Sequence, residues 1–169
     1  MFMHIHGVGP SSTLAQGIRN ALEKTKTLQP HSGGSATPPA LAFDTKRIEQ
    51  IIGHPGQAGG GVFKITLDRP GVSMMGVELT GSMGLNTWAA FVGTSERAHV
   101  AGDAAMTAPE VNRVIRALRK GGIDVVAVHN HMLDEEPRIF FLHYWGTGPV
   151  EKLAQAVRDG FDQAKGSVQ

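Results

Sequence analysis

Residues 123–164, IDVVAVHNHMLDEEPRIFFLHYWGTGPVEKLAQAVRDGFDQA, contain the pattern that decides the fold. Apolar residues alternate or cluster over 123–131 and again over 138–145, which predicts two strands joined by an acidic loop. A Gly-x-Gly-Pro turn follows, and apolar residues then recur at helical spacing over 150–164. This stretch therefore predicts a β-hairpin followed by a closing helix.

The chain upstream of this stretch has the signals of further helices and strands. Helices are predicted over 45–52, with Asp44 as the N-cap, and over 109–120, with Pro near the start and two glycines at the end. Strands are predicted over 62–68, 75–79, 88–93 and 99–101, and a flexible run is predicted over 54–61. The order of these elements predicts an α+β fold, a mostly antiparallel sheet with packed helices.

The first residues of the chain repeat part of its end. With an offset of 139 positions (143 − 4), ten of the 26 residues in 1–26 are identical to those in 140–165, and His4 aligns with His143. Similarity of this length without a gap indicates an internal repeat.

The repeat divides the chain into three parts. Residues 1–28 are predicted to be the strand and helix that remain of a preceding repeat, and 40–169 to be one complete α+β unit. Residues 29–39, rich in Gly, Ser and Pro, have the composition of a linker. A strand predicted at 2–6 would have unpaired backbone, so we expect it to pair within the chain, in a homodimer, or with a missing first repeat.

Composition excludes several classes of protein. No stretch approaches the roughly 20 apolar residues that cross a bilayer, so a membrane span is not expected. Sixteen basic and fifteen acidic residues leave a net charge of +1 without a basic block, which argues against nucleic acid as a partner. The sequence has no cysteine, so it offers neither a disulfide framework nor thiolate ligands for a metal. Residues 1–10 lack the features of a signal peptide.

Histidines in the predicted hairpin form the candidate functional site. Strand alternation puts His129 and His131 on one face together with Val125 and Ala127, and the partner strand carries His143. Two imidazoles on one strand face can converge on a divalent metal such as zinc, which then needs a third ligand. The alternative is that these rings pack at a sheet edge and bond to backbone carbonyls.

Charged residues near the histidines suggest a reaction. His143 or Glu136 would complete the metal site, Glu136 or Glu78 would act as a base, and Arg138 would orient a small anionic ligand. Arg138 could instead pair with Glu135 or Glu136, and Asp103 is a more distant carboxylate. These roles describe a metal-dependent hydrolase or lyase. The alternative is a non-enzymatic, envelope-associated ligand-binding or structural module with structural histidines.

Three segments carry a family resemblance: 129–143 (HNHMLDEEPRIFFLH), 83–91 (MGLNTWAAF) and 110–118 (EVNRVIRAL). Over about 43–164 the chain resembles the LppY/LpqO family of bacterial domains of unknown function. The resemblance implies tandem repeats, with a first repeat missing here, and an exported or lipid-anchored protein. It implies no established reaction. It also implies that five residues belong to one block: His129, His131, Glu136, Arg138 and His143.

Overall fold

The computed structural model describes residue 5, residues 7–25 and residues 41–164. The chain divides into two compact units, Met1–Thr37 and Pro38–Gln169. Most of the strand predicted at 2–6, with His4, and the linker predicted at 29–39 lie outside the described residues. None of the helices within the described ranges is long and apolar enough to cross a membrane.

The first unit contains helix α1 (Ser11–Glu23), which aligns in sequence with the final helix, α4 (Val150–Ala164). The backbone at the two helix entries is alike, with φ of 157° at Gly9 and 158° at Gly148. In each helix the fourth residue donates its N–H to the proline carbonyl before the helix, at 3.1 Å in both. The sequence similarity therefore extends to the local backbone. Assignment of 1–28 to a preceding repeat stays a prediction.

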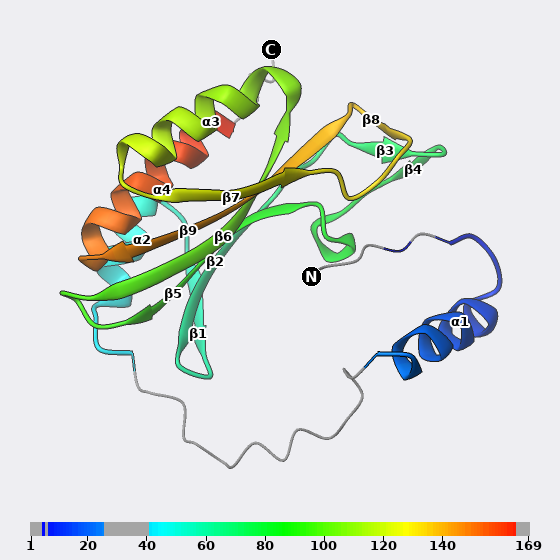
Figure 1. The fold of residues 1–169 in the computed structure, drawn as a ribbon, viewed down its shortest axis with the longest axis horizontal. Coiled ribbons are helices and arrows are strands. Elements are labelled where there is room, and N and C mark those ends of the chain that lie inside the picture. Colours follow the sequence, from blue (N-terminus) through cyan, green and yellow to red (C-terminus); the bar gives the residue numbers. More distant parts are fainter. Residues whose placement is uncertain (1–4, 6, 26–40, 165–169) are drawn as a thin grey trace. The chain divides into compact units, whose positions relative to one another are not determined.

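The second unit is built on an antiparallel sheet of six strands in the order β1-β2-β5-β6-β9-β7 (Figure 1). A small sheet has the order β4-β3-β8, and α2, α3 and α4 complete the unit. This arrangement confirms the predicted α+β fold, including the final strand followed by a helix. The bounds are α2 (Thr45–Ile52), β1 (Gly56–Gly59), β2 (Val62–Asp68), β3 (Ser73–Met74), β4 (Val77–Glu78), β5 (Asn86–Gly93), β6 (Ala98–Thr107), α3 (Ala108–Lys120), β7 (Asp124–His129), β8 (Glu135–Glu136) and β9 (Ile139–Gly148).

Helix boundaries follow local signals in the sequence. Asp44 caps α2 as predicted, because its side chain accepts hydrogen bonds from the backbone N–H groups of Lys46 and Arg47, at 2.9 and 3.3 Å. At the start of α3, Thr107 and Glu110 form a capping box.

Upstream of the hairpin, three predicted elements differ in the structure. The run 54–61, predicted to be flexible, contains β1, because pairing with β2 orders a glycine-rich segment of low strand propensity. The strand predicted at 75–79 is part of the β3–β4 hairpin, whose turn has positive φ at Met75 and Gly76. The strand predicted at 99–101 is part of the ten-residue β6. Its alanines and glycine have low strand propensity, and the strand forms because it pairs with β5 on one side and β9 on the other.

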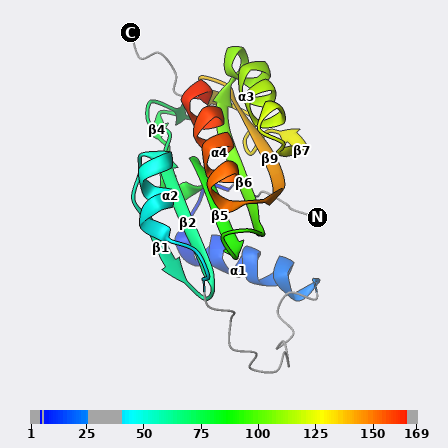
Figure 2. The same cartoon turned by 90° about the vertical axis from the view of Figure 1, so that its left-hand side faces the viewer.

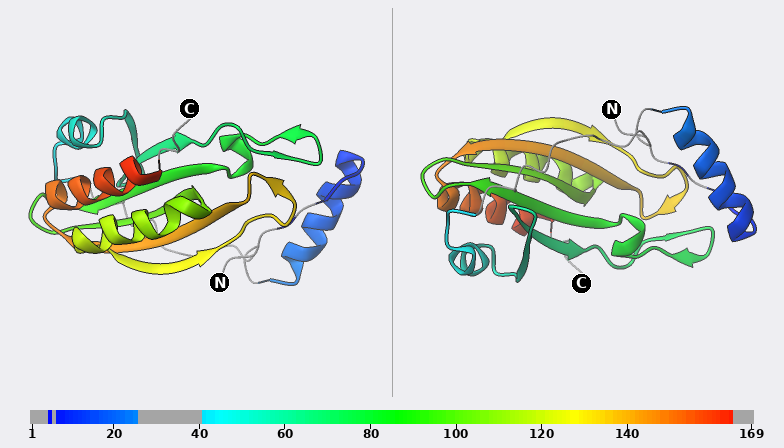
Figure 3. Two further views of the ribbon diagram at one scale, coloured as in Figure 1. Left: turned by 90° about the horizontal axis from the view of Figure 1, so that it is seen from above. Right: turned by 90° about the horizontal axis from the view of Figure 1, so that it is seen from below.

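The helices of this unit lie on one face of the six-stranded sheet (Figures 1 and 2). Alternate residues of the strands pack beneath them in the larger hydrophobic core, among them Phe91, Val100 and Leu142. The small sheet lies at one end of the large sheet, the end away from α2 (Figures 1 and 3). A second core, which includes Ala105 and Phe141, lies at that end. The candidate site adjoins this second core on the sheet face opposite the helices.

Gly102 in β6 provides the space for a buried tyrosine. A Cβ atom at this position would overlap the phenol ring of Tyr144 and lie 2.5 Å from the carbonyl oxygen of Trp88. The Tyr144 hydroxyl donates to that carbonyl at 2.9 Å. Burial, and secondarily the charge of Asp103, raise the pKa of Tyr144 well above its ordinary value, so the phenol stays a donor.

We expect Gly102→Ala to lower the free energy of unfolding by about 1–3 kcal/mol, because the added methyl displaces Tyr144 in a packed core. Thermal melting of the purified variant measures this. Gly59→Ala is the matched control, since a Cβ at this strand glycine meets nothing within 4 Å. Equal melting temperatures for the two variants would contradict the role of Gly102.

Candidate metal centre

Three histidines from the final hairpin come together on the sheet face opposite the helices. His129 is the last residue of β7, His131 lies two residues beyond it, and His143 is in the middle of β9. Cross-strand pairing puts His129 opposite Phe141. Asn130, between the first two histidines, donates its side-chain N–H to the carbonyl of Ile139 at 2.7 Å and so fixes the start of the loop.

The histidine side chains are close enough to share one ion. One ring nitrogen from each of His129, His131 and His143 lies within 4.8 Å of the other two. The ring of His129 has its centre 5.1 Å from that of His131 and 4.7 Å from that of His143. The His131 ring stacks on Phe141, with the two centres 3.3 Å apart. All three histidines are half-buried, so solvent can reach the cluster.

A β-bulge in β7 changes which residues share the face with the histidines. Val125 pairs with Tyr144, but the next pair is Ala127 with His143, because the register shifts between Val125 and Ala127. The prediction that Val125 shares a face with His129 is therefore wrong: an extra residue reverses the alternation, and Val125 packs against the helix-side core. The prediction of one continuous strand to His131 is also wrong, since β7 ends at His129.

Asp103 is the carboxylate closest to the cluster among the residues that the sequence suggested. It lies in β6 directly opposite His143, and only 4% of its surface is exposed. One carboxylate oxygen lies 3.7 Å from Nε2 of His131 and 3.6 Å from Nε2 of His143. The sequence placed it as a distant candidate, because the extent of β6 and its register with β9 are not visible in the local pattern.

The distances from the Asp103 carboxylate to the two histidines can be compared with those of hydrogen bonds and of ligands around a metal. They exceed the 2.7–3.2 Å or so of a hydrogen bond from nitrogen to oxygen. Two ligands of a tetrahedral zinc ion, each about 2.0–2.1 Å from the metal, are about 3.3 Å apart. The separations from His131 and His143 are near this value, but the ligand atoms that lie within 4.8 Å of one another come from the three histidines and do not include Asp103. Asp103 is therefore a carboxylate beside the histidine cluster.

The other residues predicted for the site lie elsewhere. Glu78 and Glu136 are exposed and stand on the two sides of Ser73 in the small sheet, outside the histidine cluster. Arg138 pairs with the buried Glu135 at 3.6 Å, as the simpler interpretation predicted. The roles of Glu78 and Glu136 as bases and of Arg138 in anion binding stay predictions.

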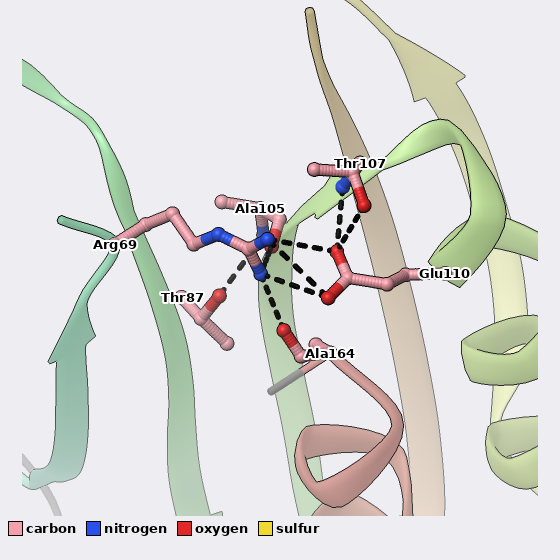
Figure 4. Close-up of polar contacts among 6 residues, drawn as sticks. All are labelled: Arg69, Thr87, Ala105, Thr107, Glu110 and Ala164. Atoms are coloured by element: carbon pink, nitrogen blue, oxygen red, sulfur yellow. Dashed lines mark hydrogen bonds and ion pairs between the residues drawn. The ribbon is translucent and has the colours of Figure 1, made fainter. Parts of the chain in front are cut away.

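A second polar network, which sequence reasoning did not identify, ties three elements together (Figure 4). Arg69, which follows β2, pairs with Glu110 at 3.0 Å and also donates to the carbonyls of Ala105 and Ala164. Glu110 accepts from the backbone N–H and hydroxyl of Thr107, at 2.6 and 2.9 Å. The network joins the end of β2 to the start of α3 and the end of α4.

The fold and the cluster define an α+β domain with a candidate metal centre made of histidines, with one aspartate beside them. A family model described as Domain of Unknown Function (DUF1259) matches residues 46–163. The match covers more than half of the chain, which therefore belongs to that family of domains of unknown function. No curated protein and no solved structure matches the chain. The match covers the histidine cluster and Asp103, and bears on neither the LppY/LpqO name nor a tandem repeat.

Proposed function

We propose that this protein binds one divalent metal ion, with zinc as the first candidate among the common ions, through His129, His131 and His143, with the Asp103 carboxylate beside the ion and the fourth position open. The convergence of three ring nitrogens within 4.8 Å of one another carries the proposal. Imidazole nitrogen and carboxylate oxygen are both common zinc ligands. The buried position of Asp103 also supports it, because a bound cation would compensate a carboxylate that is held out of water.

Partial exposure of the cluster favours a metal that has a position open to a further ligand. Catalytic zinc sites commonly keep one position for water or substrate, and the ion lowers the pKa of bound water or polarises a carbonyl. We therefore propose hydrolysis or lyase-type chemistry on a small anionic substrate. Glu136 and Glu78 are the bases predicted from the sequence. They lie in β8 and β4 of the small sheet, on the two sides of β3.

Metal analysis of protein purified without a histidine tag tests the proposal. We expect one equivalent of metal per chain and a melting temperature that falls by about 10 °C in excess chelator, because a ligand at a thousandfold its Kd stabilises the folded state by about 4 kcal/mol. Absence of stoichiometric metal, together with unchanged melting in chelator, would contradict it.

The second candidate is a non-enzymatic module in which the histidines are structural. The stacking of His131 on Phe141 at 3.3 Å favours this alternative, since a ring packed in this way stabilises the loop without an ion. It predicts that His131→Ala lowers the melting temperature by the same amount with and without chelator.

A further inference from the structure

The candidate metal centre continues into a cross-strand row of side chains on the same sheet face. In antiparallel strands, directly opposed residues point to the same face. Asp103 is opposed by His143 on one side and by Trp88 of β5 on the other. Trp88 is in turn opposed by Thr66 of β2. An indole ring therefore stands next to the carboxylate that contacts the histidines.

The neighbouring row contains a second indole and a lysine. It runs from Lys64 of β2 through Ala90 and Ala101 to Trp145 of β9. The Lys64 ammonium lies 4.5 Å from the centre of the Trp88 ring, a cation–π contact. Trp145 is 46% exposed, so nearly half of this large apolar side chain is accessible to a ligand.

Small residues lie beside the two indoles. Trp88 is opposite Asp103 and Trp145 is opposite Ala101, so their Cα atoms are about 12 Å apart, two strand spacings across and two residues along. Ala101 occupies β6 between them, and both Ala101 and Ala90 are half-buried. The side chains at these two positions are single methyl groups, so they rise little above the sheet beside the larger indoles.

The charge of this face favours an anion. Lys64 and a divalent metal outweigh the single negative charge of Asp103. Of the other acids on this face of the sheet, Asp124 pairs with Arg119 at the edge of the sheet, and Asp68 packs against Gly81. A ligand carboxylate would therefore be attracted to the metal side of the row.

We propose that the open face of the sheet binds a carboxylate that carries a ring. The carboxylate contacts the metal beside Asp103, and the ring lies over Ala101 against Trp88 and Trp145. The inference rests on the proposed metal centre and names the class of ligand for it.

Tryptophan fluorescence and calorimetry test this, because Trp88 and Trp145 are the two tryptophans of the sequence. Benzoate is the probe, acetate is the control without a ring, and benzamide is the control without a charge. With metal-loaded protein we expect saturable quenching by benzoate and at least about tenfold weaker binding of both controls. Acetate lacks the stacking on an aromatic ring, which contributes about 1–3 kcal/mol, and benzamide lacks the negative charge that the metal and Lys64 attract.

Variants assign the contacts. We expect Trp145→Phe to weaken benzoate binding about fivefold or more, and Lys64→Met to weaken it several-fold by removing an attractive charge. Lys46→Met is the matched control, because Lys46 is an exposed lysine in α2 on the helix side. Metal content is measured on the same preparations, so that loss of the metal is seen separately.

The outcomes separate the two proposals. Metal-loaded protein that binds benzoate no more tightly than acetate would overturn this inference and leave the metal proposal standing. Benzoate binding that is equally tight in metal-loaded and metal-free protein would overturn the inferred contact between the carboxylate and the metal, and the metal proposal would still be decided by metal analysis alone. A dimer whose tryptophan fluorescence does not respond to benzoate would show that a second copy covers the face, and would overturn the inference.

Discussion

Replacing His143 by alanine is expected to raise the dissociation constant for zinc by about 100-fold or more. Loss of a group that only orients a metal ligand commonly costs 10–100-fold, so loss of a ligand itself should reach at least the upper end of this range. His143 has the central position, since its ring lies 4.7 Å from that of His129 and its Nε2 lies 3.6 Å from Asp103. Competition against a chromophoric chelator measures the change.

His99→Ala is the matched control for this prediction. His99 lies on the same sheet face, but its ring contacts Trp145 and bonds to Thr147 at 2.9 Å, and it is not in the cluster. We expect its zinc affinity to equal that of the wild type. If His143→Ala and His99→Ala bind zinc equally well, the three clustered histidines do not form the site. Asp103→Asn, which keeps the volume but removes the charge, should give an intermediate loss.

Arg69→Met is expected to lower the free energy of unfolding by about 3 kcal/mol, the lower end of the cost of breaking a buried ion pair. The substitution leaves Glu110, whose side chain is 2% exposed, without its cation and removes a donor from the carbonyl at the end of α4. The lower end applies because Glu110 keeps its two hydrogen bonds from Thr107 at the start of α3. Chemical denaturation measures the loss.

Arg47→Met provides the comparison within the same chain. Arg47 pairs with Glu151 at 3.3 Å, but both side chains are more than half exposed, so this substitution should cost at most about 1 kcal/mol. If the two variants are equally stable, the Arg69 network does not anchor the helices to the sheet. The double variant Arg69→Met/Glu110→Leu should recover part of the loss, because it also removes the unpaired charge.

Local sequence patterns determined much of the second unit. The caps of α2 and α3 and the periodicities of α2, α3 and α4 involve residues within a few positions of one another, and the helices form where these signals lie. The hairpin that carries the histidines was also visible, because two apolar strands flank a short acidic loop. His129, His131 and His143 could thus be grouped before the structure was known.

Tertiary structure alone decided the remaining features of the site. Asp103 joins the histidines because β6 pairs with β9, forty residues further along the chain (143 − 103), and no local pattern encodes that register. Pairing of β7 with β9 also places the bulge after Val125, and Arg69 meets Glu110 only when β2 and α3 pack together. Local signals reflect the conformational preferences of a single segment. Strand register and buried polar contacts instead depend on which distant segments pack against each other and bury their surfaces. The sequence by itself therefore determined the histidines and the elements that carry them, and the packed sheet determined the carboxylate and the aromatic face beside them.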